Sequence, residues 1–155
     1  MELRERTAQT AAEYFEKAQR PEIRAMLPQA AQTLEEALAA FEQSKHPGAS
    51  SYGRTIWADG RYLGDVWCYA MDAAQTPQAM VSYCILDPDD WGRGYAGEAL
   101  ALFLGEVRER FGLTRFGAFT YAANLASIRV LEKNGFVLRE RFWEDGTESC
   151  YFETV

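Results

Sequence analysis

The chain has 155 residues, of which 48% are hydrophobic, and 23 acidic against 16 basic side chains give it a net charge of −7. Chains of this length bury about 70% of the surface that their unfolded form exposes, so a core can form without disulfides. Nucleic acids and anionic membranes need a cationic surface, so the acidic balance argues against both as main partners. We expect a single domain over residues 1–155.

The cysteines and the apolar runs also exclude classes of protein. Three cysteines without close pairing indicate neither a disulfide framework nor a metal-binding cluster. The first residues lack the apolar segment of a signal peptide, and no apolar run approaches the roughly 20 residues that span a membrane. We therefore expect a soluble, cytoplasmic protein with reduced thiols and no metal.

The first third of the chain is helical in character. A helix is predicted over residues 10–19 and ends at Pro21, and a second fits residues 33–43, where Thr33 and Glu36 form a capping box. A short strand is compatible with residues 2–6.

Strand signals dominate the remainder. Runs rich in aromatic and β-branched residues predict one hairpin around Asp59-Gly60 and another around Asp145-Gly146, with strands at 52–58, 61–70, 136–143 and 148–154. Between the hairpins come a linker, strand, helix, strand and helix, at 71–78, 79–86, 95–111, 114–121 and 125–133. This order predicts an α/β fold (an α+β mixed sheet) whose sheet is partly parallel.

A glycine-rich turn lies between the predicted strand at 79–86 and the helix at 95–111. Gly92, Gly94 and Gly97 let backbone N–H groups approach a ligand, and the free N–H groups at a helix start suit a pyrophosphate. The same glycines satisfy the dinucleotide-binding pattern, but no acidic residue lies between Glu109 and Glu132 to bind a ribose. The pattern therefore argues against a nicotinamide cofactor, whereas a purely structural turn stays open.

Two segments together carry a family resemblance. They are Asp87-Pro-Asp-Asp-Trp-Gly-Arg-Gly-Tyr-Ala-Gly-Glu98-Ala-Leu100 and Asn124-Leu-Ala-Ser127-Ile-Arg-Val-Leu-Glu-Lys133-Asn-Gly135-Phe136. They resemble the two core motifs of the GNAT N-acetyltransferases, and the second is similar to the branch that acetylates ribosomal-protein N-termini. The close likeness runs over residues 80–136. It implies a mixed sheet of about six or seven strands flanked by about four helices, with the fourth and fifth strands splayed apart.

The resemblance also implies acetyl-CoA as cofactor and where it would lie. The pantetheine arm would pair with the strand before the glycine turn, at Tyr83, Cys84, Ile85 and Leu86, and would bond to Asn124. The pyrophosphate would lie on the turn, which comprises Trp91, Gly92, Arg93, Gly94, Tyr95, Ala96 and Gly97. The chain departs from the family pattern at Trp91, where Gln or Arg is usual, so a side-chain contact to the cofactor is not implied there.

The chemistry of acetyl transfer suggests the catalytic candidates. The amine must lose a proton, the thioester oxygen needs hydrogen-bond donors, and the departing thiolate benefits from a proton donor. Many family members place a tyrosine where this chain has Leu131, and the terminal-acetylating branch instead resembles it in having a serine at Ser127. We take Ser127 as donor, with helix capping as the alternative, and the N–H near Ile85 as the oxyanion contact. Glu98 and Tyr83 are candidate bases, although Glu98 also suits a helix start.

The acceptor is the least specified part of the prediction. The branch resemblance suggests a protein or peptide N-terminus, with polyamines, aminoglycosides and a catalytically inactive acyl-CoA sensor left open. Other residues that suit an acceptor site, but equally a surface, core or dimer interface, are Glu140, Glu144, Asp145, His46, Tyr52, Trp57, Trp67, Tyr69 and Trp143. A homodimer is compatible with the fold alone.

Overall fold

A computed structural model describes residues 1–72, 74 and 76–155. Its centre is a seven-stranded sheet in the order β1-β2-β3-β4-β5-β7-β6. All neighbouring strands run antiparallel except β4 and β5, which are parallel. The strands are β1 (Glu2–Glu5), β2 (Tyr52–Ala58), β3 (Arg61–Asp72), β4 (Gln78–Ile85), β5 (Arg115–Tyr121), β6 (Phe136–Glu144) and β7 (Thr147–Thr154). The sheet is therefore mixed, as the sequence predicted.

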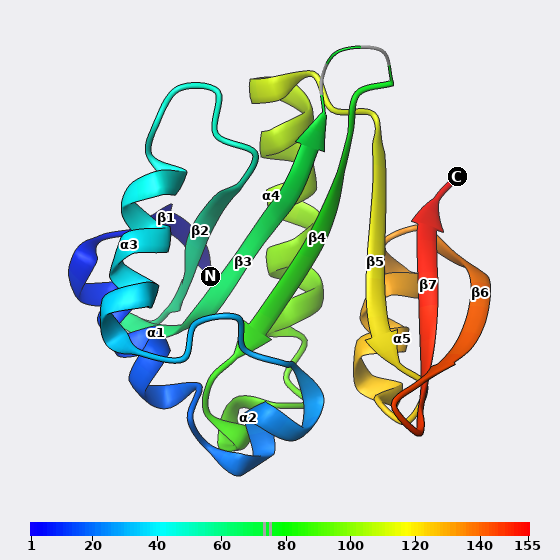
Figure 1. Cartoon of the computed structure of the whole chain (residues 1–155), viewed down its shortest axis with the longest axis horizontal. Helices are drawn as coiled ribbons and strands as arrows, with labels where there is room; N and C mark the ends of the chain where they lie inside the picture. The colour runs from blue at the N-terminus through cyan, green and yellow to red at the C-terminus, as the bar shows by residue number, and fades with distance from the viewer. Residues whose placement is uncertain (73, 75) are drawn as a thin grey trace.

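Within the described residues, five α-helices and one short 3₁₀ helix are placed around the sheet (Figure 1). They are α1 (Ala8–Lys17), α2 (Pro21–Met26), α3 (Leu34–Ser44), η1 (Pro88–Asp90), α4 (Tyr95–Phe111) and α5 (Leu125–Lys133). Figure 1 shows α4 behind the strands and α1 to α3 in front of them. This arrangement leaves the sheet with a separate hydrophobic layer on each face.

The larger core lies between the sheet and α4. The helix buries a stripe of residues at helical spacing, namely Ala99, Leu100, Phe103, Leu104 and Val107. The smaller core lies under α1 and α2, where Ala18 and Ile23 pack with Cys84 and Leu86 of the β4 region. Both layers thus hold the end of β4 that precedes the glycine turn.

The sheet has a gap between β4 and β5. Their parallel ladder has three residue pairs, the last joining Met80 to Gly117, although β4 continues to Ile85 and β5 to Tyr121. Figure 1 shows the two strands side by side at the top and well apart at the bottom. The predicted separation of the fourth and fifth strands is confirmed.

Several boundaries agree with the sequence prediction because the local signals are strong. The helices at 95–111 and 125–133 have the predicted bounds, and Gly112 closes the first in the left-handed conformation with φ 68°. Both Asp-Gly turns form hairpins with positive φ at both residues. The strand compatible with residues 2–6 is β1.

Other predictions needed correction. Pro21 does not only end a helix, because it also occupies the first position of α2, an additional helix that raises the expected four to five. The capping box at Thr33 is half formed: its hydroxyl accepts from the Glu36 N–H, but the Glu36 carboxylate accepts from Gln32. The linker at 71–78 is shorter, since β3 extends to Asp72 and β4 begins at Gln78. Ala73 and Gln75 of that linker lie outside the described residues.

Candidate active site at the gap between β4 and β5

The N-terminus of α4 is built to receive an anion. Gly94 is its N-cap residue, with φ 82°, and supplies no side chain to bond the free N–H groups of the first turn. The helix is 17 residues long, so its dipole places positive potential at this end. Uncapped amides at a helix start bind phosphate groups readily. The predicted pyrophosphate position therefore has the donors that it needs.

The glycines of the turn keep this space open. A Cβ built on Gly92, Gly94 or Gly97 would have no protein atom within 4 Å. Gly92 and Gly94 have φ values of 76° and 82°, which favour glycine, but Gly97 has neither a positive φ nor a crowding neighbour. A glycine in a helix costs about 1 kcal/mol relative to alanine. Neither the backbone conformation nor a crowding neighbour explains a glycine at position 97. A ligand that approaches the turn closely from outside would explain it.

The backbone of β4 directs polar groups toward the gap. The Leu86 N–H donates to the Leu63 carbonyl oxygen at 2.9 Å, so even-numbered residues of this register pair with β3. Because backbone groups alternate in direction along an antiparallel ladder, the N–H and C=O groups of Tyr83 and Ile85 point the other way, toward β5. At this level β5 has already diverged. The position suits an extended ligand that pairs with β4 like an added strand.

Trp91 links the glycine turn to the same strand. Its indole N–H donates to the Ile85 carbonyl oxygen at 2.8 Å, and the side chain is 40% exposed. The residue that departs from the family pattern therefore fixes the turn against the end of β4. Arg93, its neighbour but one, is exposed and forms no ion pair within the described part of the chain.

The second motif brings two hydroxyl groups together. The Tyr83 and Ser127 hydroxyl oxygens lie 2.8 Å apart, and the Tyr83 hydroxyl also lies 3.2 Å from the Ser127 carbonyl oxygen, to which it can donate. The Asn124 side-chain oxygen accepts from the Ser127 N–H and so caps α5, while its amide NH₂ group stays available. Burial raises the pKa of Tyr83 to about 12, and its bond with Ser127 offsets this in part. Tyr83 is thus protonated at neutral pH, so its hydroxyl is better suited to donate a hydrogen bond than to act as the predicted base.

Glu98 is not part of the hydrogen bonds that join Tyr83 and Ser127. It occupies the first turn of α4, where an acidic side chain favours the helix dipole, and it is exposed. No hydrogen bond or ion pair of its carboxylate occurs among the residues that the structure covers. Its predicted role as base stays a prediction.

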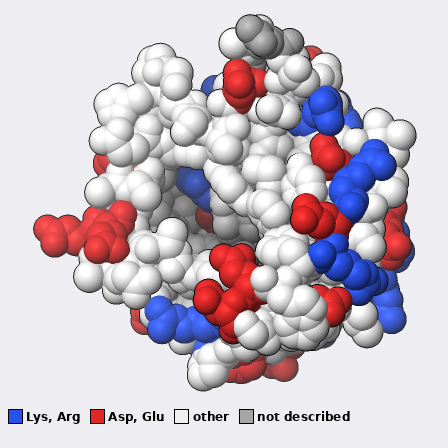
Figure 2. All heavy atoms as spheres, turned by 45° about the vertical axis from the view of Figure 1, so that its right-hand side comes forward, with Lys and Arg blue, Asp and Glu red and all other residues white. Residues whose placement is uncertain are grey.

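A cavity of about 500 Å³ straddles the gap on the face opposite Tyr83. Val81 and Ser82 of β4 line it together with Phe119 and Tyr121 of β5, all beyond the last paired residues of the two strands. Neighbouring residues in a strand point to opposite faces, so Ser82 faces this cavity and Tyr83 faces α5. Figure 2 shows the molecule hollowed near the middle of the drawn face, with a basic side chain inside the hollow and acidic side chains below it. The gap therefore connects the hydroxyl pair on one face with a cavity on the other.

Most of the lining was missed from sequence. Met26, Leu27 and Pro28 come from the overlooked α2 and the residues after it, and Phe142 comes from β6. A signal was present in β5, where Phe116 and Phe119 put large apolar residues on both faces of one strand. Of the candidates for an acceptor site, Tyr69, Glu144 and Asp145 line the cavity. The others lie elsewhere, namely Tyr52, Trp57, Trp67, Trp143, Glu140 and His46.

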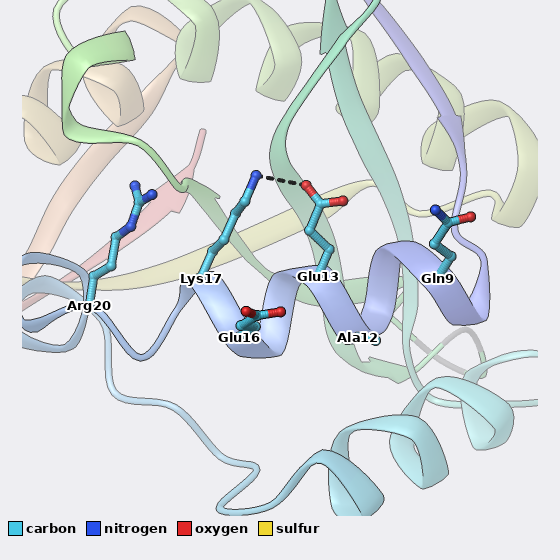
Figure 3. A pocket seen from close by; sticks show the side chains of 6 residues that line it. All are labelled: Gln9, Ala12, Glu13, Glu16, Lys17 and Arg20. Atoms are coloured by element: carbon cyan, nitrogen blue, oxygen red, sulfur yellow. Dashed lines mark hydrogen bonds and ion pairs between the residues drawn. The ribbon is translucent and has the colours of Figure 1, made fainter.

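A larger groove of about 630 Å³ runs along one helix and contains none of the predicted site residues. Figure 3 shows its lining, in which Lys17 is paired with Glu13 at 2.7 Å and Arg20 extends beside them. All six lining residues belong to α1 or the turn after it. Because its sides come from one solvated helix face, the gap is the better candidate for the active site.

A partly buried ion pair joins the segment before α1 to β3. Arg6 donates to the Asp65 carboxylate at 3.0 Å, and the Tyr62 hydroxyl donates to its other oxygen. Burial raises the pKa of Asp65, and Arg6 followed by Tyr62 opposes that shift. A Cβ on Gly53 would collide with the Arg6 guanidinium, so this glycine leaves room for the pair. This network was not predicted from sequence, because its charged partners are 59 positions apart.

Comparison with known proteins identifies the family. The family model described as "Acetyltransferase (GNAT) domain" matches residues 1–137. The chain belongs to the GNAT acetyltransferase family. Its relatives include an uncharacterised N-acetyltransferase, YoaA, of Bacillus subtilis (strain 168), which is 33% identical over 89 residues. That match covers 55% of this chain and 49% of YoaA, so it spans about half the length of that relative.

Solved GNAT structures share the fold at low sequence identity. RimL, a ribosomal L7/L12 alpha-N-protein acetyltransferase in complex with coenzyme A, has a TM-score of 0.82 and 17% identity over 99% of this chain and 92% of its own. A spermidine N-acetyltransferase, SpeG, from Vibrio cholerae has a TM-score of 0.81 and 14% identity over 100% and 95%. The aminoglycoside acetyltransferase AAC(6')-Ib in complex with acetyl-CoA has a TM-score of 0.78 and 17% identity, over 99% of this chain and 92% of its own. These likenesses confirm the GNAT fold. Among the described residues, no helix is long and apolar enough to cross a membrane.

Proposed function

We propose that this GNAT protein is an N-acetyltransferase that moves the acetyl group of acetyl-CoA directly to a primary amine. The acceptor that we propose is a peptide or protein N-terminus. The observation that carries the proposal is the gap between β4 and β5 beyond Met80 and Gly117. The uncapped start of α4 and the Tyr83–Ser127 pair lie on one side of it, and a cavity with acidic residues lies on the other. Donor and acceptor would meet in the gap.

Coenzyme A fits the residues on the donor side. The open cradle at Gly92, Gly94 and Gly97 and the first amides of α4 would hold the pyrophosphate. The backbone of Tyr83 would pair with the pantetheine arm, and the Asn124 amide group would donate to it. Relatives with this fold contain coenzyme A or acetyl-CoA, which supports the same ligand here.

The chain contributes positioning and proton transfer to the reaction. Acetyl-CoA supplies an acetyl thioester, whose carbon–sulfur bond breaks as the amine nitrogen forms the amide bond. The Ile85 N–H, directed into the gap, would donate to the thioester oxygen. Ser127 would hold a proton at Oγ for the departing thiolate, and Tyr83 would fix the orientation of that hydroxyl. The amine would lose its proton to water or a carboxylate at the cavity.

The acceptor side favours a cation of limited charge. Glu144 and Asp145 line the cavity, and no lysine or arginine belongs to its described lining. RimL, which shares the fold, acts on a protein N-terminus, whereas SpeG and AAC(6')-Ib act on small amines. The rest of the lining that the structure describes has no carboxylate to pair with an ammonium group far from these two residues, which supports an acceptor with one amine such as a peptide N-terminus.

The proposal is tested by incubating the purified protein with acetyl-CoA and a panel of short peptides, spermidine and an aminoglycoside. Mass spectrometry should find one added acetyl group on an amine, with one coenzyme A thiol released for each. A protein that binds acetyl-CoA but acetylates none of these amines would support the alternative of an acyl-CoA sensor. Failure to bind acetyl-CoA would remove the enzyme assignment.

A further inference from the structure

The lining of the acceptor cavity is unusual for a site that binds a highly charged amine. Eight of its lining residues are apolar or aromatic, namely Met26, Leu27, Pro28, Tyr69, Val81, Phe119, Tyr121 and Phe142, of which Val81 is itself buried in the core under α4. Four more carry hydroxyl groups, and the two carboxylates come from neighbouring residues at one hairpin turn. The cavity thus has one acidic end and a long apolar wall.

The apolar wall is centred on Phe119. This residue lies within β5, yet 55% of its surface is exposed. Its ring meets Phe142 edge to face at 6.0 Å between centroids and lies 5.0 Å from the ring of Tyr151. These three aromatic rings, from β5, β6 and β7, form a fixed ledge beside the gap. Contact between water and these aromatic rings is unfavourable, so an apolar group that displaces this water would gain binding free energy.

The acidic end is fixed by backbone structure. Asp145 has φ 50° in a tight turn with Gly146, and Glu144 is the last residue of β6. Because a two-residue hairpin holds both, their carboxylates stay near the cavity mouth. A single ammonium group would be attracted there, whereas further charges of a polyamine or aminosugar would lie against the aromatic wall and lose hydration without a partner.

We propose that the preferred acceptor is a peptide N-terminus whose first side chain is large and apolar, such as Phe, Leu or Met. The ammonium group would enter at Glu144 and Asp145, and the side chain would lie on the ledge of Phe119 and Phe142. The inference rests on the proposed function, because it names the substrate of that same site. It separates this chain from relatives that acetylate polyamines or aminoglycosides.

The test compares kcat/KM for matched tetrapeptides that differ only in the first residue, with Phe, Leu, Ala or Ser at that position, and for spermidine. We expect kcat/KM for the Phe and Leu peptides to exceed that for the Ala and Ser peptides by roughly 10- to 100-fold, since burying such a side chain is worth that ratio. Phe119→Ala should remove most of this preference. Trp143→Ala is the matched control, because Trp143 is a 71% exposed aromatic on β6, next to Phe142, but outside the cavity lining.

The outcomes separate the two proposals. Equal rates for all peptides, a preference for spermidine, or the same loss in both alanine variants would overturn the inference while leaving acetyl transfer intact. Absence of any acetyl-CoA binding in calorimetry would instead overturn the proposed function. A second copy on the ledge is the competing occupant. If sedimentation shows a dimer that Phe119→Ala alone converts to monomer, with peptide preference unchanged, the ledge is an interface and the inference is wrong.

Discussion

Ser127→Ala is the substitution that most directly tests the mechanism. The structure limits its effect on folding, because the Ser127 N–H keeps its bond to Asn124 and the helix cap survives. The hydroxyl bond to Tyr83 is lost, at a cost of about 1 kcal/mol, and the better helix propensity of alanine returns about 0.5 kcal/mol. Tyr83 retains the Ser127 carbonyl oxygen as an acceptor at 3.2 Å. The free energy of unfolding should therefore change by less than about 1 kcal/mol.

The effect on catalysis should be much larger. Loss of a positioned proton donor typically lowers kcat by about 10²- to 10⁴-fold, which corresponds to about 2.7–5.4 kcal/mol in the barrier. The release of the coenzyme A thiol can be followed with a thiol-reactive dye, because all three cysteines of the protein are buried and contribute little background. The affinity for acetyl-CoA, measured by calorimetry, should stay within a factor of about two, since the hydroxyl does not hold the cofactor.

Tyr83→Phe is the control, since it removes the partner and keeps the Ser127 hydroxyl. The loss of one hydrogen bond of about 0.5–1.5 kcal/mol should lower kcat by roughly 3- to 10-fold, less than in Ser127→Ala. Full kcat in Ser127→Ala would refute the donor role. A loss in Tyr83→Phe as large as in Ser127→Ala would transfer that role to Tyr83.

Three further predictions concern the supporting structure. Arg6→Met leaves the buried Asp65 carboxylate without its ion-pair partner and should cost about 3–5 kcal/mol in urea unfolding, and adding Asp65→Asn should restore much of it. Burial raises the pKa of Tyr83 to about 12, so the protonated hydroxyl stabilises the fold fully below about pH 10, and this stabilisation is lost as the pH rises toward 12. Between these pH values the free energy of unfolding of Tyr83→Phe should fall by about 2–3 kcal/mol less than that of the wild-type protein, as measured by unfolding at a series of pH values. Trp91→Phe removes the bond to Ile85 and should weaken acetyl-CoA binding by roughly 3- to 10-fold in calorimetry, with unchanged affinity as the contradicting result.

The parts of the fold that sequence predicted are those with local causes. The bounds of α4 follow from its apolar period and from Gly112, and the hairpins follow from Asp-Gly pairs whose positive φ suits the turn. By contrast, α2 has six residues and one buried side chain, Ile23, so it depends on packing against the sheet and gives little local signal. The mixed sheet followed from element order, but the gap between β4 and β5 followed only from the family resemblance.

The candidate site divides in the same way. The glycine turn and the segment from Asn124 to Ser127 are continuous in sequence, so they were found there, and the structure brings Ser127 to Tyr83. The acceptor cavity combines residues of α2, three central strands and the last hairpin, and no spacing rule connects them. The Arg6–Asp65 pair was missed for the same reason, since only the folded sheet brings Arg6, which follows β1, across β2 to Asp65 of β3.

The measurement that tests the central claim most directly is calorimetric binding of acetyl-CoA to Gly94→Ala and Gly60→Ala. Both glycines have positive φ, 82° and 73°, and a Cβ on either would meet no protein atom within 4 Å. The two variants therefore carry a similar backbone strain of about 1–2 kcal/mol, but only Gly94 lies in the proposed cradle. We predict wild-type affinity for Gly60→Ala and at least a tenfold weaker affinity for Gly94→Ala. Equal affinities in the two variants, or no binding to the wild-type protein, would contradict the assignment of this turn to acetyl-CoA.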